Sequence, residues 1–170
     1  ICSFGHSLGY AETVESLMGV EVPRRAQYLR VILHELSRVH SHLLWLGLAA
    51  DAFGFESLFM HCWRLRERVL DIFEATTGGR VILSYVQIGG VVRDIDADTL
   101  RWICDKLDSI EGEYKEICAT FLKDSSVRSR LDGVGYLSQQ HASELCMVGP
   151  FARASNVPYD CRVLGHGAYG

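Results

Sequence analysis

The chain has 170 residues, 48% of them hydrophobic, and a formal net charge of −4. A chain of this length can bury roughly 70% of its unfolded surface, so we expect a single domain over residues 1–170. The charge balance lacks the basic excess of nucleic-acid-binding proteins, which argues against nucleic acid as a partner. The longest apolar stretch, LLWLGLAADAFGF, is shorter than the roughly 20 residues that span a bilayer.

The first predicted helix follows Pro23, a residue that suits the first turn of a helix. Apolar residues then recur at steps of three or four, which is the spacing of one helix face. These residues are Ala26, Leu29, Ile32, Leu33, Leu36, Val39, Leu43 and Leu46. The pattern predicts a long amphipathic helix that ends near Gly47 or a few residues beyond it.

Two further helices are predicted in the middle of the chain. One covers residues 57–79, where Gly78-Gly79 supplies a C-terminal cap able to adopt positive φ. The other begins with Asp98 as its N-cap and carries apolar residues at alternating steps of three and four. These residues are Leu100, Ile103, Leu107, Ile110, Tyr114, Ile117 and Phe121. The regular seam predicts that Leu107 is buried in a helical bundle.

The β content is predicted to be small. Residues 81–94, VILSYVQIGGVVRD, are rich in β-branched side chains and indicate one or two strands with a turn at Gly89-Gly90. After residue 124 the pattern loosens into short elements rich in glycine and serine. The expected fold is therefore mainly α, a bundle of long helices with a small β appendage.

Several charged residues and histidines are candidates for a polar site. Glu35, Arg38 and His42 lie three and four residues apart on one stripe of the first helix, whereas His34 and His40 fall elsewhere. A hydrogen-bonded structural network is the favoured interpretation, because a metal site would need more than one imidazole on that face.

Three other charged residues are candidates for the same kind of polar network. Arg93 and Asp94 follow the Gly-Gly turn and suggest either a functional charge pair or a turn salt bridge. Arg153 lies in the segment VGPFARAS near the C-terminal end. The sequence contains neither a phosphate-binding glycine loop nor an H-E-x-x-H motif.

Six cysteines show no C-x-x-C spacing, and four of them stand within apolar runs. This favours buried thiols in a reducing compartment over a disulfide framework. The cysteines are Cys2, Cys62, Cys104, Cys118, Cys146 and Cys161. On its own, the spacing Cys2-x-x-x-His6 is only weak support for a metal ligand.

The order of the motifs adds weight to Cys2 and His6. The chain contains CSFGH, YAETVESLMGVEVPRRAQYLR, HELSRVHSHLLWLG, TGGR, IGGVVRD, GVG and VGPFARAS in this sequence. It resembles the large-subunit family shared by energy-converting NiFe hydrogenases and the 49-kDa subunit of respiratory complex I. The similarity looks strongest to the formate-hydrogenlyase type, and it implies that the chain is a central part of such a subunit, with a hydrogenase large-subunit-like fold.

By that resemblance, Cys2 is one of four thiolates that hold a NiFe(CN)2CO centre in the complete subunit. The other three thiolates would lie outside these residues. His6 would hydrogen-bond the sulfur atoms of the centre. Cys2, His6, Tyr10 and Glu15 stand in register with the hydrogenase form, whereas complex I subunits have lost the metal and use the same cavity for quinone. No catalytic acid or base is assigned, and no cofactor or activity is expected of these 170 residues alone.

The resemblance also implies partners and a location. An oxidoreductase of this family would exchange electrons with an iron–sulfur subunit and act on dihydrogen and protons, or on quinone in the complex I branch. Subunits of a membrane arm would hold it at the cytoplasmic side of the inner or plasma membrane. A non-catalytic module that only supplies subunit interfaces is the alternative from another class. Asn156 stands where the family usually has glycine, a change that asparagine tolerates because it enters the left-handed region readily.

Overall fold

The chain forms two compact units in a computed structural model, which describes residues 2–165 and 167–169. The boundary lies between Phe121 and Leu122. The first unit contains α1 (Ser3–Met18), α2 (Arg24–Ala52), α3 (Glu56–Thr77), most of α4 (Ala97–Lys123), and a hairpin of β1 (Val86–Gln87) and β2 (Gly90–Val91). The second contains α5 (Ser125–Leu131), α6 (Gln139–Glu144), α7 (Gly149–Ala154) and the 3-10 turn η1 (Gly167–Tyr169). The mainly α fold with a small β appendage is confirmed.

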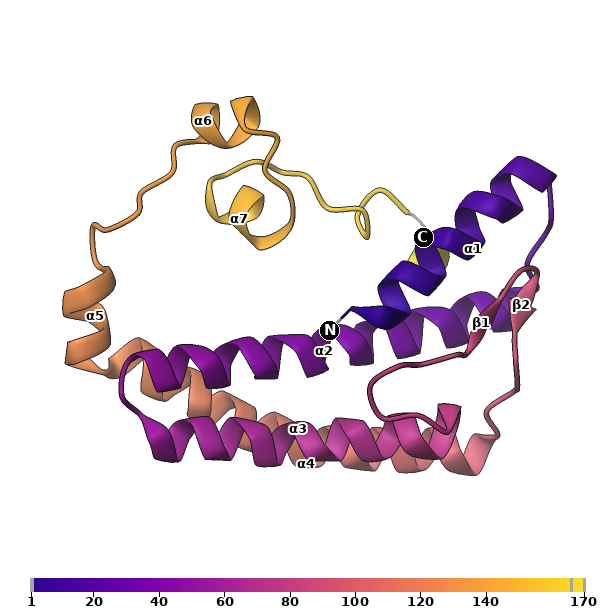
Figure 1. Cartoon of the computed structure of the whole chain (residues 1–170), viewed down its shortest axis with the longest axis horizontal. Helices are drawn as coiled ribbons and strands as arrows, with labels where there is room; N and C mark the ends of the chain where they lie inside the picture. The colour runs from indigo at the N-terminus through magenta and orange to yellow at the C-terminus, as the bar shows by residue number, and fades with distance from the viewer. Residues whose placement is uncertain (1, 166, 170) are drawn as a thin grey trace. The chain divides into compact units, whose positions relative to one another are not determined.

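Helices α2 and α3 form the centre of the first unit, where they lie side by side and antiparallel (Figure 1). Their shared core is fully buried and includes Leu29, Leu33, Leu36 and Leu43 of α2 with Leu65, Val69, Ile72 and Phe73 of α3. Gly47 allows a close approach, because a Cβ at that position would lie 3.0 Å from the Trp63 ring. The first predicted helix is confirmed, with Pro23 just before it and an end five residues beyond Gly47 at Ala52.

The C-terminal end of α3 has the predicted glycine cap. Gly78 adopts a left-handed conformation with φ +82°, and its N–H donates to the carbonyl oxygen of Glu74 at 3.0 Å. The Thr77 hydroxyl donates to the carbonyl oxygen of Phe73 at 2.8 Å, and the Gly79 N–H donates back to that hydroxyl at 3.2 Å. These bonds turn the chain sharply out of the helix.

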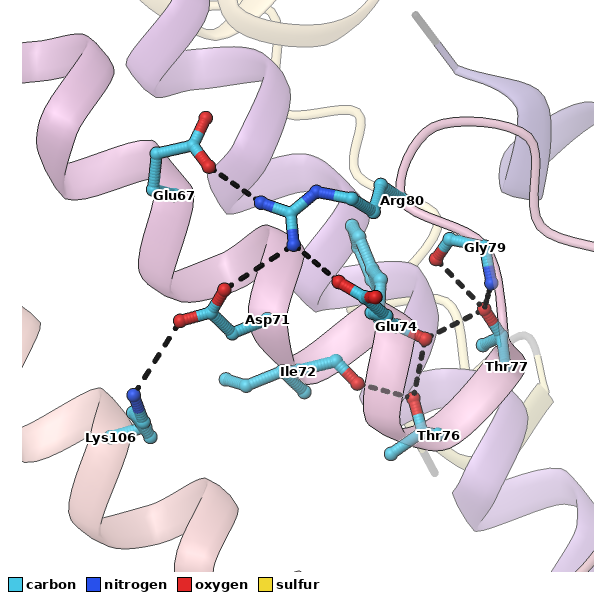
Figure 2. A network of polar contacts seen from close by, with 10 residues as sticks. Glu67, Asp71, Ile72, Glu74, Thr76, Thr77, Gly79, Arg80 and Lys106 are labelled. Atoms are coloured by element: carbon cyan, nitrogen blue, oxygen red, sulfur yellow. Dashed lines mark hydrogen bonds and ion pairs between the residues drawn. The ribbon is translucent and has the colours of Figure 1, made fainter.

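Arg80 ties the loop after α3 back to the helix (Figure 2). Its guanidinium lies 2.5 Å from carboxylate oxygens of both Glu67 and Glu74 and 3.3 Å from Asp71. Lys106 of α4 reaches the other oxygen of Asp71 at 3.6 Å. One arginine therefore faces three carboxylates from successive turns of α3, and the network continues to α4.

Helix α4 begins two residues earlier than the sequence predicts, because its N-cap is Asp96 and not Asp98. The Asp96 carboxylate accepts a hydrogen bond from the N–H of Thr99 at 2.7 Å, which satisfies a free donor of the first turn. Asp98 lies in that first turn and pairs with Arg101 instead. Two aspartates two residues apart offer the same capping chemistry, so the local pattern did not separate them.

The apolar seam of α4 is only partly buried. Ile103, Ile110 and Ile117 are fully buried, whereas Leu107 is half-buried and 37% of Tyr114 is exposed. The predicted burial of Leu107 is therefore wrong in degree. In the first unit α4 packs on one side of the α2–α3 pair, and only every seventh residue of the seam reaches the centre of the core.

Replacing Leu107 with alanine should cost roughly 1–2 kcal/mol of unfolding free energy, below the roughly 2–5 kcal/mol typical of a fully buried leucine. The half-buried side chain loses less apolar contact and leaves less of a cavity. Urea unfolding measures the difference, and Asp105→Ala, an exposed change on the same helix, should leave the midpoint nearly unchanged. A Leu107→Ala midpoint equal to that of the parent would contradict this packing of α4.

The hairpin is short, and its turn is displaced from the predicted position. Val86 pairs with Val91 and Gln87 with Gly90, so the turn residues are Ile88 and Gly89, not Gly89 and Gly90. Gly89 has φ +83°, which favours glycine at the second turn position. The hairpin contacts both α1 and α2.

The second unit consists of short helices, as the loosened sequence pattern predicts. Asn156 has φ +60°, so the expectation that asparagine replaces glycine in a left-handed position is confirmed. Arg153 contacts the carboxylate of Asp160 at 3.4 Å, and Arg162 contacts the same carboxylate at 2.6 Å. Arg153 thus belongs to a local ion-pair network.

Candidate functional site

Helix α1 carries Cys2 and His6 at its start. Cys2 directly precedes the helix, and its carbonyl oxygen accepts a hydrogen bond from the N–H of His6 at 3.1 Å. The two residues are four positions apart, so both lie on one face of the helix, and both are exposed. The sequence pattern did not predict this helix, because Gly5 and Gly9 interrupt it and its apolar periodicity is weak.

The opposite face of α1 packs on α2. Phe4 is fully buried, and Gly5 lies over the His34 ring, where an added Cβ would be 3.4 Å from Cε1. The hydroxyl of Ser3 donates to the carbonyl oxygen of Val81 at 2.8 Å. These contacts fix the first turn of α1, and with it the positions of Cys2 and His6.

A buried ion pair fixes the other end of α1. Arg30 of α2 donates from Nη2 to Glu15 Oε1 at 2.6 Å and from Nη1 to Glu15 Oε2 at 3.0 Å. Both side chains are nearly inaccessible, with 4% and 7% of their surfaces exposed. Two parallel bonds of this kind hold the carboxylate in one orientation.

The same pair holds the hairpin. Arg30 also donates to the carbonyl oxygens of Gln87 at 2.8 Å and Gly90 at 2.9 Å. The N–H of Gly89 donates to Glu15 Oε1 at 2.7 Å. The bonds from Arg30 hold the pKa of the Glu15 carboxyl below its usual range, and burial opposes them. Both buried charges are therefore satisfied, and α1, α2 and the hairpin are joined at one point.

An open groove separates α1 from the hairpin. His6, Ser7, Tyr10 and Ala11 line one side, and Val86, Gln87 and Ile88 line the other. The groove has a volume of about 540 Å³. His6 therefore opens onto a partly apolar space large enough for a small ligand.

The cysteines are less buried than the sequence predicts. All six are free thiols, but only Cys62 is buried, and Cys118 is partly exposed. The other four are exposed and comprise Cys2, Cys104, Cys146 and Cys161. Within residues 2–165 and 167–169, no three His, Cys, Asp or Glu side chains come together as a metal site. The described residues thus offer a metal at α1 a single sulfur ligand, Cys2.

The predicted polar stripe on α2 includes a histidine that the sequence analysis placed elsewhere. Arg38 contacts Glu35 at 3.0 Å, and it also contacts His34 Nε2 at 3.2 Å. His42 is exposed on the same helix. His34 and Arg38 are four residues apart, and so are Arg38 and His42, so the spacing alone does not single out His34 as a contact of Arg38.

Asp94 pairs with Arg25 of α2 rather than with its neighbour Arg93. The carboxylate accepts from Arg25 Nε at 2.7 Å, and Arg25 Nη2 donates to the carbonyl oxygen of Ile95 at 2.7 Å. The Arg93 carbonyl oxygen accepts from the buried Tyr85 hydroxyl at 2.7 Å. Asp94 therefore forms a long-range ion pair with α2, and not the local turn salt bridge that was one of the two interpretations of Arg93 and Asp94.

Comparisons with known proteins identify relatives of this chain. Residues 52–169 match the family described as "Respiratory-chain NADH dehydrogenase, 49 Kd subunit". The chain belongs to this family. It is 43% identical to the membrane-bound hydrogenase subunit alpha of Pyrococcus furiosus, over 95% of this chain and 38% of the relative. It is 39% identical to formate hydrogenlyase subunit 5 of Escherichia coli, over 95% of this chain and 28% of the relative.

Other relatives belong to the NADH-quinone oxidoreductases and to a respiratory complex. An NADH-quinone oxidoreductase subunit of Protochlamydia amoebophila is 37% identical over 90% of this chain and 38% of the relative. A solved chain of the membrane-bound sulfane sulfur reductase, an archaeal respiratory membrane complex, has a TM-score of 0.83 and 33% identity. That match covers 88% of this chain and 40% of the solved one. The chain thus spans well under half the length of these relatives.

No helix in the described part of the chain is long and apolar enough to cross a membrane. Two of the relatives are named as parts of membrane-bound enzymes.

The sequence pattern does not reveal two buried charged groups in this unit, Arg30 and Arg66. Arg30 lies among apolar residues of α2, yet it pairs with Glu15 fifteen positions earlier. Arg66 lies on the apolar side of α3 and is buried as well. The sequence shows only that each arginine lies within the apolar stripe of its helix. That position suggests burial, but it does not identify the residue with which the arginine pairs.

Proposed function

We propose that the chain is the helical core of the large subunit of a NiFe hydrogenase-type oxidoreductase. The subunit would evolve or take up hydrogen and pass electrons to an iron–sulfur subunit. The pairing of Cys2 with His6 on one exposed face of α1, beside an open groove, carries the proposal. The similarity to a membrane-bound hydrogenase subunit and to a formate hydrogenlyase subunit supports it.

Cys2 would supply one thiolate of the NiFe centre, with the remaining ligands coming from polypeptide outside these residues. An exposed, unpaired thiol fits that role, because soft sulfur ligands suit nickel. The bound centre would supply the heterolytic cleavage and formation of dihydrogen. His6, one turn along the same face, would donate a hydrogen bond to the ligand sulfur and so tune its basicity.

The rest of this chain would hold these two groups in place. Phe4 and Gly5 anchor the first turn of α1 on α2, and the Glu15–Arg30 pair fixes its last turn and the hairpin. A ligand held within about 0.5 Å of its working position needs such rigid support. The hairpin forms the second wall of the groove onto which His6 opens.

A complex I-like quinone site is the second candidate. The matched family is named for the 49-kDa subunit, and the groove combines the apolar side chains of Val86 and Ile88 with the polar His6 and Tyr10. A partly apolar groove that also carries polar groups fits a quinone ring and its carbonyl oxygen. In that case Cys2 would be an ordinary exposed thiol.

We also propose that the subunit is cytoplasmic and is held at the membrane by partners. The first unit exposes large apolar side chains on α1 and α2, including Tyr10, Leu17, Met18, Trp45 and Leu48. Large apolar side chains left exposed in this way would be covered by other polypeptides in a complex. An iron–sulfur subunit and membrane-arm subunits are the partners that the relatives' complexes suggest. A purely structural module would use the same surfaces without Cys2 and His6.

The decisive experiment isolates the complete gene product with its natural partners and assays it two ways. We expect hydrogen evolution from reduced viologen and stoichiometric nickel, and no quinone reduction by NADH. Quinone reduction without nickel would support the complex I-like candidate instead. Neither activity in an intact complex would leave the interface module and contradict both enzymatic proposals.

His6→Ala should slow hydrogen turnover by roughly 10–100-fold while nickel stays bound, because His6 would act through the ligand sulfur. Metal analysis and the viologen assay measure the two effects separately. Ser16→Ala, an exposed change on the same helix, is the control and should leave both unchanged. Unchanged hydrogen turnover in His6→Ala would contradict the proposed role of His6.

A further inference from the structure

Arg66 of α3 is a buried cation without a counter-ion. Only 8% of its surface is exposed, and among the described residues it forms no ion pair and no hydrogen bond. Arg30, the other deeply buried arginine, has two bonds to Glu15 and three to hairpin carbonyl oxygens. Unlike Arg30, Arg66 therefore has no anionic partner among the described residues.

The surroundings of Arg66 do not neutralise it. Its Cζ lies 4.9 Å from the centre of the Trp63 ring, a cation–π contact that offsets only part of the lost hydration. Its Nε is buried and has no acceptor. The adjacent carboxylate, Glu67, is exposed and pairs with Arg80.

A second unpartnered polar group lies close to Arg66. His40 of α2 is 2% exposed, and its buried Nε2 has no hydrogen-bond partner. Burial lowers the pKa of His40 to about 4, and the charge of Arg66 adds to the effect. Burial also lowers the pKa of Arg66. Two helices therefore bring two unsatisfied nitrogen groups to the α2–α3 seam.

We propose that Arg66 binds a carboxylate side chain from polypeptide outside residues 1–170, which packs over the α2–α3 seam beside His40. The proposal goes beyond the proposed function, because it holds equally for the hydrogenase and the quinone candidates. It concerns how the oxidoreductase subunit is held together, not what it catalyses.

The chemistry of the site favours a carboxylate. A guanidinium has five N–H donors and no acceptor, so its partner must be an acceptor and, in a buried place, an anion. A carboxylate matches the guanidinium with two parallel bonds. A neutral acceptor would leave the charge uncompensated.

The length of the relatives favours polypeptide as the source. The chain covers 38% of the Pyrococcus furiosus relative and 40% of the solved reductase chain, so most of each relative lies outside the matched region. A carboxylate held by packed polypeptide has already lost part of its hydration and its freedom of movement. A free anion would lose both on entering a site where Arg66 is 8% exposed.

The test places Arg66→Met in two settings, the 170-residue chain alone and the complete gene product assembled with its natural partners. In the chain alone, methionine removes a buried unpaired charge and should raise the melting temperature by roughly 2–4 °C. In the assembled protein, it leaves the partner carboxylate buried and unpaired, and the yield of complex should fall at least about tenfold. Arg66→Lys keeps the charge and should recover part of that yield.

Arg64→Met is the matched control, because Arg64 lies on the same helix with 71% of its side chain exposed. It should change neither quantity. Assembly of Arg66→Met at the level of Arg64→Met would overturn the proposal. So would a loss of stability in both settings, which would make Arg66 an ordinary structural residue. If acetate or phosphate stabilises the chain alone while assembly is insensitive to Arg66→Met, the site takes a free anion and the proposal is wrong.

Discussion

Replacing Arg30 with methionine is expected to destabilise the chain by roughly 3–5 kcal/mol at neutral pH. The change leaves the Glu15 carboxylate buried without its counter-ion, and it removes the donors to the carbonyl oxygens of Gln87 and Gly90. Urea unfolding followed by circular dichroism measures the loss. Because the pair joins α1, α2 and the hairpin, amides of the hairpin should also exchange faster with solvent.

The contribution of Glu15 to the pH dependence, read as the difference between Arg30→Met and the parent, should change sign. In the parent, the pKa of Glu15 is lowered mainly by Arg30, so the stabilisation is present above the unfolded-state pKa and is lost as pH falls through the folded-state pKa. Without Arg30, burial dominates and raises the Glu15 pKa, so acidification should restore stability. Unfolding measured from pH 7 to 4 separates the two slopes.

The matched control is Arg25→Met, which removes an ion pair to Asp94 whose two side chains are 58% and 63% exposed. Exposed pairs contribute little, so its unfolding midpoint should stay near the parent's. A double variant, Glu15→Met with Arg30→Met, should recover much of the loss, because it removes both charges. An Arg30→Met midpoint close to that of Arg25→Met would contradict the buried pair.

The second large effect concerns His40, whose neutral imidazole is buried against Phe73 at a ring distance of 5.8 Å. Burial lowers its pKa from 6.5 to about 4. The unfolded chain therefore binds a proton below pH 6.5 that the folded chain does not bind until about pH 4. Stability should fall as pH drops across this window, by up to about 3 kcal/mol.

His40→Leu removes the titrating group, and the fall between pH 6.5 and 4 should shrink by that amount. His42→Gln on the same helix is the control, because His42 is exposed. Thermal unfolding at half-unit pH steps resolves the slopes. An unchanged slope in His40→Leu would mean that the imidazole is hydrated, not buried as the structure has it.

Sequence periodicity was enough to predict the long helices, because each has a continuous apolar face that packs into the core. It did not predict α1, whose inward residues Phe4, Ala11 and Glu15 are too few and too mixed in chemistry to form a clear stripe. It also overestimated the burial of Leu107, since a seam shows which residues share a face and not how much of that face is covered.

The candidate site divides in the same way. Cys2 and His6 were found from their spacing and the motifs around them, which are local. Glu15 pairs with Arg30, 15 positions away, and Asp94 pairs with Arg25, 69 positions away. A local sequence pattern cannot predict contacts between residues so far apart in the chain. Buried ion pairs of this kind need the three-dimensional fold before either partner can be named.

Nickel content of a Cys2→Ser variant tests the central proposal most directly. The variant is made in the complete gene product, matured in a host with the nickel-insertion machinery, and compared with the parent and with Cys104→Ser, which changes another exposed thiol. Serine is a poor ligand for a soft metal site, so we expect nickel in the parent and in Cys104→Ser, and none in Cys2→Ser. Stoichiometric nickel in the Cys2→Ser protein would contradict the ligand assignment and the hydrogenase proposal built on it.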